Sequence, residues 1–181
     1  MHPGRRRPAH AGGADCCPLR PVTDVRLVGF EELSATALRD RLLVRRSAFW
    51  SGSALDDATV VGLHDPLFFH QFGGFGALAL SADGEDAGYL LGVVSADRLA
   101  VVHAVAVHPS WRRHGVAGRL LGRFAALATG LGARAVQAVV VPGDTAARAM
   151  GARFGAHVAP SAGHAGASAD RMLLTRTLPL P

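Results

Sequence analysis

The spacing of apolar residues along the chain follows two different periods, and each period predicts a different kind of element. Over residues 31–50, leucines recur at nearly helical intervals and predict an amphipathic helix. A less regular helical pattern covers residues 55–72. A short apolar stretch at residues 24–30 predicts a strand ahead of both helices.

The period changes to two in the middle of the chain and predicts a three-stranded antiparallel meander. Residues 76–82 and 88–96 alternate as a hairpin around an Asp-Gly turn at 83–84. The third strand covers residues 99–107. It ends at the His-Pro pair 108–109, because proline donates no hydrogen bond to a sheet.

Helical and strand periods alternate in the last third of the chain. One stripe of apolar residues predicts a helix over residues 116–131, and residues 135–141 form the next strand. A short helix over 144–155, a loop rich in small residues over 160–169 and a strand over 171–178 follow. The order β-α-α-β-β-β-α-β-α-β predicts a mixed α/β fold, and the long helix connects two strands that should pair in parallel.

The length of 181 residues suits one domain, which we expect over residues 22–181. Residues 1–21 hold four arginines against one aspartate, so we expect a basic, disordered tail.

The remaining residues carry a net charge of only +2, so we expect no nucleic-acid partner. No apolar run reaches the roughly 18 residues of a membrane span, and no secretory signal is apparent; these features predict a cytoplasmic protein without a membrane partner.

Cysteine and histidine placement argues against a metal site. The only cysteines are the adjacent Cys16 and Cys17, which lie in the tail. The nine histidines are scattered and form no HExxH motif. We therefore expect no metal cofactor.

The stretch between the meander and the long helix reads WRRHGVAG and places two glycines where a helix begins. A glycine in a helix costs up to about 1 kcal/mol of helix stability relative to alanine. We therefore expect that the function of this segment requires backbone without side chains. The first turn of a helix has unpaired amides that bind anions such as phosphate. The spacing is neither GxxxxGK[ST] nor GxGxxG, which excludes a Walker loop and a dinucleotide fingerprint.

The six residues RRHGVA at 112–117 match the [Q/R]xxGx[G/A] signature of the GNAT N-acetyltransferases, and the chain resembles that superfamily. The flanking VAVHP and GRLL are typical of it, and DTAARAMGARFGA, at 144–156, resembles its NxxAxxLYxxxGF block. The resemblance covers roughly residues 24–178. It implies a central mixed sheet flanked by helices and acetyl-CoA as the acetyl donor.

Carried over residue by residue, the resemblance implies a donor site. Backbone amides from Arg113 to Gly118 would hold the pyrophosphate, and the strand end would pair with the pantetheine arm. One amide of that strand end would stabilise the oxyanion. Asp144 would lie near the pantetheine. The expected donor-binding residues are Val105, Ala106, Val107, Arg112, Arg113, His114, Gly115, Val116, Ala117, Gly118 and Asp144.

The catalytic groups are less clearly marked. The tyrosine that serves the family as general acid aligns with Gly151, and the only tyrosine of the chain is Tyr89. A base must deprotonate an amine before it attacks, and His103 is the first candidate because it shares strand parity with Val105 and Val107. The alternative is a histidine hydrogen-bonded in the sheet. Weaker candidates are Asp65, His70 and His164, with Phe68, Phe69 and Phe72 as pocket walls.

These observations favour an N-acetyltransferase that moves acetyl from acetyl-CoA to a primary amine, which we expect to belong to a small molecule. No activated serine or cysteine motif occurs, which favours direct attack over a covalent intermediate. The alternative, prompted by Gly151, is a non-catalytic acyl-CoA-binding sensor or partner domain. By resemblance, a homodimer is conceivable.

Overall fold

We describe a computed structural model of the chain, which covers residues 25–44, 46–51, 55–64, 73–164, 166 and 169–180. The described residues form one seven-stranded sheet: β1 (Val25–Gly29), β2 (Phe75–Ser81), β3 (Asp86–Val94), β4 (Leu99–Val107), β5 (Ala135–Val140), β6 (His157–Ser161) and β7 (Arg171–Thr177). The α-helices are α1 (Ala35–Arg39), α2 (Arg46–Trp50), α3 (Asp57–Gly62), α5 (Val116–Gly130) and α6 (Thr145–Arg153).

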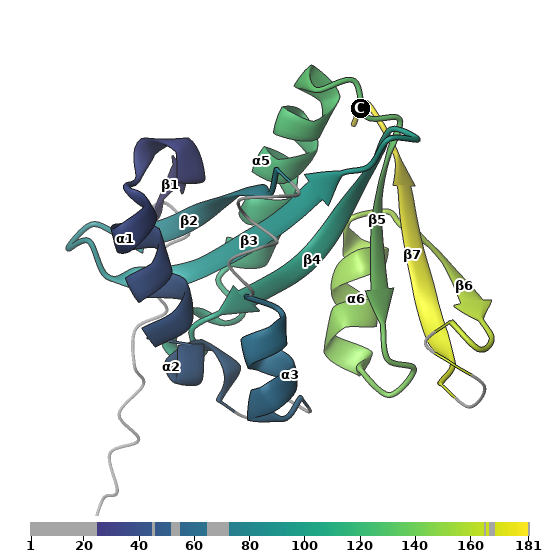
Figure 1. The fold of residues 1–181 in the computed structure, drawn as a ribbon, viewed down its shortest axis with the longest axis horizontal. Coiled ribbons are helices and arrows are strands. Elements are labelled where there is room, and N and C mark those ends of the chain that lie inside the picture. The colour runs from purple at the N-terminus through teal and green to yellow at the C-terminus, as the bar shows by residue number, and fades with distance from the viewer. Residues whose placement is uncertain are drawn as a thin grey trace, which may run out of the picture.

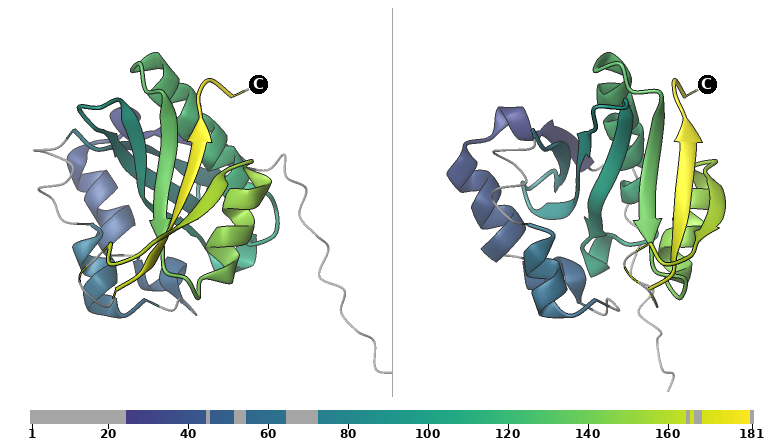
Figure 2. Two further views of the ribbon diagram at one scale, coloured as in Figure 1. Left: turned by 90° about the vertical axis from the view of Figure 1, so that its right-hand side faces the viewer. Right: turned by 45° about the vertical axis from the view of Figure 1, so that its right-hand side comes forward.

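The sheet has the strand order β1-β2-β3-β4-β5-β7-β6. All neighbours are antiparallel except β4 and β5, which pair in parallel across the crossover through α5, as the sequence predicts. Helices α1, α2 and α3 lie on one face of the sheet, and α5 and α6 lie on the other (Figures 1 and 2).

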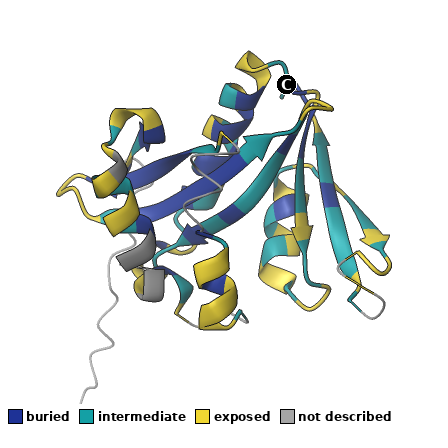
Figure 3. Cartoon of the chain, in the orientation of Figure 1, coloured by how far each residue is buried: buried dark blue, intermediate teal, exposed yellow. Residues whose placement is uncertain are grey.

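A hydrophobic core fills each face. The α5 side is built on the buried stripe Val116, Leu120 and Phe124, as predicted. The last residue of the predicted stripe, Leu131, is exposed, because it lies just past the end of the helix. The α1–α2 side packs around Tyr89 with leucines and aromatic residues. Buried positions concentrate on β2 and β3, between the edge strand β1 and β4 (Figure 3).

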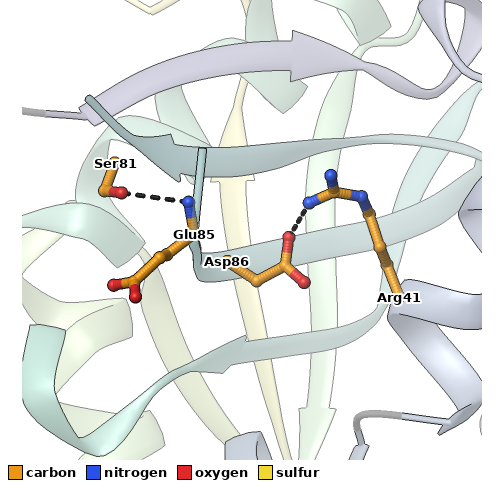
Figure 4. Close-up of polar contacts among 4 residues, drawn as sticks. All are labelled: Arg41, Ser81, Glu85 and Asp86. Atoms are coloured by element: carbon orange, nitrogen blue, oxygen red, sulfur yellow. Dashed lines mark hydrogen bonds and ion pairs between the residues drawn. The ribbon is translucent and has the colours of Figure 1, made fainter. Parts of the chain in front are cut away.

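The predicted hairpin of β2 and β3 is confirmed. Its turn contains Gly84 in the left-handed region, at φ +79°. Ser81 Oγ accepts a hydrogen bond of 3.0 Å from the amide of Glu85, and Asp86 forms an ion pair with Arg41 (Figure 4). The ion pair ties the start of β3 to the helical segment that precedes α2.

Two features of the predicted order are wrong. The helix expected over residues 31–50 is divided into a 3₁₀ turn, α1, a π-helical turn over Asp40–Val44 and α2. Ser34 caps α1 through a bond from the amide of Ala37, so a new helix starts inside the predicted one. The predicted order also lacks β6, whose last two residues fall in the predicted loop over 160–169. Among the described residues, β6 is an edge strand that pairs with β7 alone.

In the described part of the chain, no helix has the length and apolar character needed to cross a bilayer. The tail at residues 1–21 lies outside the described residues.

Candidate functional site

A gap in the sheet opens where β4 and β5 separate. The two strands pair only from Leu99 opposite Ala135 to Val102 opposite Ala138. Beyond these pairs β4 continues to Val107, while β5 continues alongside β7 instead. The ribbons of β4 and β5 meet at one end and diverge toward the other (Figure 1). Along this gap, the edge of β4 has no neighbouring strand among the described residues, so an extended ligand could lie there.

A β-bulge lies on β4 where the gap begins. Two consecutive residues of β3 pair with Val102 and Ala104, which leaves His103 as the bulge residue. The bulge reverses the alternation of the strand: Val102 and Val105 pack on the α5 side, whereas Ala104 packs on the opposite side. A single extra residue therefore changes the face of the sheet on which the following side chains of β4 lie.

His103 lies on the α3 side of the sheet, beside Leu63 and His64. The parity with Val105 and Val107 expected from the sequence is wrong, because the bulge interrupts the alternation. Burial lowers the pKa of His103, and the His64 imidazole lowers it further. A hydrogen bond with the backbone of Leu63 opposes both effects. The imidazole is therefore neutral near pH 7 and able to accept a proton.

The amino end of α5 lies beyond the carboxyl end of β4. Gly115 precedes the helix in the left-handed conformation, at φ +75°, and no side chain caps the helix there. The first amide bonded within the helix is that of Arg119, which donates to the carbonyl of Gly115. The amides of Val116, Ala117 and Gly118 precede that bond and form the open first turn.

The two glycines serve different purposes in this turn. Gly115 occupies a backbone conformation that side chains strain, and Arg113 has a similar left-handed φ of +68°. Gly118 has ordinary helical geometry, and a Cβ added there would meet no atom within 4 Å. The space above Gly118 is open, which is what the approach of a phosphate to the helix start requires.

The side chain of Arg112 connects this turn to neighbouring segments by hydrogen bonds. Its Nε donates to the carbonyl of Val107 at 3.2 Å, and its Nη2 donates to the carbonyls of Phe49 and Ser51 at 3.2 and 2.9 Å. The guanidinium thus joins the end of β4 to the end of α2. His114 donates from Nδ1 to the Arg112 carbonyl at 2.8 Å.

Asp144 starts α6 on the other side of the gap. Its carboxylate accepts a bond of 2.9 Å from the amide of Ala147 and so caps the helix. Asp144 is partly buried, and it lines both cavities described below.

Two cavities meet at the gap. The first, of about 320 Å³, lies between the diverging strands and reaches α3 on one side and α6 on the other. The second, of about 410 Å³, extends from the end of β4 past Arg112 and Ala117 to the start of α6. They share the wall residues Trp50, Val105, Asp144, Ala147 and Met150. Together they form a path from the open turn of α5 to the interior of the gap.

Gly151 is buried in α6 against β7. A Cβ added to it would lie 2.2 Å from the Leu174 side chain. Leu174 therefore occupies the space that any side chain at position 151 would enter.

A buried polar network on the α3 side was not predicted from the sequence. The Tyr89 hydroxyl accepts a bond of 2.6 Å from Trp50 Nε1 and donates to His64 Nε2 at 2.7 Å. His64 Nδ1 donates to the Val60 carbonyl at 2.6 Å. Burial raises the pKa of Tyr89, and the bond from Trp50 opposes that shift. The apolar neighbours of Tyr89 in the hairpin give no signal for these partners.

The structure describes only one of the remaining candidates from the sequence. Asp65, His70 and the neighbouring phenylalanines lie outside the described residues. His164 is exposed, and its Nδ1 lies 3.2 Å from Ser161 Oγ. The described residues contain no cluster of three or more side chains suited to hold a metal ion.

The arrangement of a split parallel pair, a strand bulge and an open helix start agrees with the match to a family model. The model of the acetyltransferase (GNAT) family matches residues 23–156. The chain belongs to the GNAT family. The resemblance inferred from the RRHGVA motif is thereby confirmed, and so is the mixed-sheet fold. No curated protein matches the chain.

Solved structures of acetyltransferases share this GNAT fold at low sequence identity. An acetyltransferase of the GNAT family from Staphylococcus aureus Mu50 has a TM-score of 0.67 and 12% identity, over 86% of this chain and 99% of that one. An aminoglycoside 6'-acetyltransferase type Ii has a TM-score of 0.64 and 15% identity, over 86% and 99%. A Bacillus subtilis acetyltransferase in complex with CoA has a TM-score of 0.61 and 16% identity, over 86% and 99%.

Proposed function

We propose that this GNAT protein transfers acetyl from acetyl-CoA to a primary amine of a small molecule by direct attack. The observation that carries the proposal is the continuous path from the open first turn of α5 into the gap between β4 and β5. Such a path suits a long ligand with an anionic group at one end and a reactive group at the other. A CoA thioester has this form.

The donor would lie along the second cavity. The amides from Arg113 to Gly118 would bind the pyrophosphate, with His114, Gly115, Val116 and Ala117 forming the turn. Val105, Ala106 and Val107 would offer their free strand edge to the pantetheine arm, and Asp144 would face it from the start of α6. Arg112 would act by positioning, because its donors already bind three carbonyls.

The acceptor would enter from the α3 side of the gap, where Trp50, Thr59 and Leu63 line the first cavity. The described walls on this side are largely apolar, which supports a small-molecule acceptor. The aminoglycoside acetyltransferase among the structural relatives also supports this choice.

The chemistry would proceed by addition and elimination at the thioester carbonyl. The amine nitrogen forms a bond to the carbonyl carbon, and its proton passes to His103, directly or through a water. An amide of the β4 edge stabilises the oxyanion, and the carbon–sulfur bond then breaks to release CoA thiolate. The thiolate can leave without a tyrosine acid, because a thiol pKa near roughly 8.5 makes it a tolerable leaving group.

A second candidate function is acyl-CoA binding without catalysis. The contact between Gly151 and Leu174 favours it, because the position where the family has its tyrosine acid carries no side chain, and a Cβ there would displace the end of Leu174. The two candidates differ in turnover and agree in donor binding.

A thiol-release assay separates them. The purified protein is incubated with acetyl-CoA and a panel of polyamines, aminoglycosides, amino acids and peptides, and free CoA thiol is measured with and without each amine. Amine-dependent release that falls about 100-fold in His103→Gln supports the transferase and its base. Binding of acetyl-CoA without release by any amine supports the non-catalytic candidate instead.

A further inference from the structure

The first cavity passes through the sheet, so its walls divide into two groups. On the α3 side lie Trp50, Thr59, Leu63 and His103. On the α6 side most of the walls are apolar, and the charged Arg176, which pairs with Val136, lies among them. The apolar walls are Val102, Leu121, Val136, Ala138, Val140, Met150, Phe154 and Leu174.

Pairing and packing assign Ala138 to the α6 side. Ala138 pairs with Leu174 in the antiparallel register, and directly paired residues face the same way. Leu174 packs against Gly151 of α6. The neighbouring Gln137 is bonded to Thr175 on the opposite side. The residue that borders the α6 side of the gap at this point is therefore Ala138, whose side chain is a single methyl group.

Several of these apolar walls remain only half-buried. Val102, Ala138, Val140, Met150 and Phe154 line the cavity and keep part of their surface exposed. Apolar surface that borders a cavity lacks the contacts that a packed core would supply. A ligand with its own apolar surface would provide them.

The α6 side is continuous with the path proposed for the donor. Val105, Ala147 and Met150 border both cavities, so the inner end of the donor path opens onto the apolar walls. The group next to the thioester would therefore meet this side, while the acceptor uses the other.

The available space exceeds an acetyl group. The cavity measures about 320 Å³ over both sides of the sheet, so the acyl chain shares it with the acceptor, and each carbon of an acyl chain needs roughly the 30 Å³ of a liquid water molecule. Acetyl would fill only a small part of it.

We propose that the donor is an acyl-CoA with a neutral acyl chain of four to eight carbons, whose tail occupies the α6 side of the cavity. This inference rests on the proposed CoA-thioester site and extends the proposed transfer from acetyl to longer acyl groups. Arg176 lines the same cavity, near the C-terminal end of α6, and its Nη1 donates to the Gly155 carbonyl at 3.3 Å. Arg176 limits how far the chain can reach.

The test is a calorimetric series of CoA, acetyl-, butyryl-, hexanoyl- and octanoyl-CoA on the full chain. We expect tighter binding with each methylene that enters the cavity, by up to about fourfold each, so that hexanoyl-CoA binds at least about tenfold tighter than acetyl-CoA. Equal affinity for acetyl- and hexanoyl-CoA would overturn the inference and leave the proposed function intact. Failure of CoA and every thioester to bind would overturn both.

Two variants, each replacing an alanine by leucine, test where the acyl chain lies. Ala138→Leu fills the α6 side and should bring the ratio of acetyl- to hexanoyl-CoA dissociation constants close to one. Ala152→Leu adds the same side chain to an exposed position of α6 and should keep the wild-type ratio. A wild-type ratio in a folded Ala138→Leu protein contradicts the assignment. If Ala138→Leu does not fold, the wild-type series still decides the chain-length preference.

A further comparison tests whether the far end of the acyl chain is neutral or charged. Nε of Arg176 is buried and makes no hydrogen bond within the described residues. A terminal carboxylate is therefore the competing chemistry, and succinyl-CoA is compared with butyryl-CoA, which has the same chain length. Tighter binding of butyryl-CoA supports the neutral chain, and tighter binding of succinyl-CoA overturns it.

Discussion

The Tyr89 hydroxyl lies 2.7 Å from His64 Nε2, and this bond joins the centre of the sheet to the end of α3. The same hydroxyl accepts from Trp50 at the end of α2. Trp50 lines the candidate acceptor cavity, so one phenol fixes two helical segments that shape it.

Removing that hydroxyl should weaken the fold measurably. Tyr89→Phe keeps the ring but deprives Trp50 and His64 of this partner, and an unsatisfied buried group costs about 1–3 kcal/mol. We expect a loss of about 2 kcal/mol in the free energy of unfolding, measured by denaturant titration. Trp50→Phe, which removes one donor, should retain the bond between Tyr89 and His64. A Tyr89→Phe protein as stable as wild type would show that the network contributes nothing.

His103 should make stability depend on pH on the acid side. Well above its ordinary pKa of about 6.5, the imidazole is neutral in both the folded and unfolded chain, so it adds no pH dependence there. Because burial lowers its pKa in the fold, the unfolded chain takes up the proton first as pH falls below that value. Stability should then decrease toward acid pH. His103→Gln should flatten this slope between about pH 6.5 and pH 5, measured by unfolding at each pH. An unchanged slope would rule out the buried imidazole as its source.

The contact between Gly151 and Leu174 should make position 151 intolerant of a side chain. Gly151→Ala gains helix propensity of up to about 1 kcal/mol, but its Cβ would lie 2.2 Å from the Leu174 side chain. Overpacking costs about 1–3 kcal/mol, so we expect net destabilisation in thermal unfolding. Gly118→Ala is the matched control, because its Cβ meets open space and should stabilise the helix. Stabilisation by both substitutions would contradict the contact.

Much of the fold follows from the sequence because its elements have strong local signals. The stripe of α5, the meander and the end of β4 before Pro109 depend on periodicity and on proline, and they agree with the structure. β6 was missed because it is short, contains Pro160 and runs into a loop of small residues. An edge strand tolerates such a proline, so the residue did not exclude a strand.

The backbone geometry of the proposed donor half of the site could be expected from the sequence, whereas the geometry of the proposed acceptor half could not. The turn at Gly115 and the cap at Asp144 are local motifs, so their backbone geometry could be expected from neighbouring residues. The bulge at His103 depends on register with another strand, and no local pattern marks it. The bonds of Tyr89 join three segments that are distant in the sequence, so only the folded chain brings them together.

The central claim is that the open first turn of α5 binds the pyrophosphate of a CoA thioester. Its most direct test is calorimetric titration of acetyl-CoA into wild type, Gly118→Glu and Gly122→Glu. Both positions leave space for a side chain, and Gly122 lies one turn farther along the same face. A carboxylate at Gly118 should leave the helix at least as stable, because acidic groups suit its first turn.

We predict that wild type binds acetyl-CoA, that Gly118→Glu binds about 100-fold more weakly, and that Gly122→Glu stays within about threefold of wild type. A folded wild-type protein that does not bind acetyl-CoA, or a Gly118→Glu protein that binds it as well as wild type does, would contradict the account.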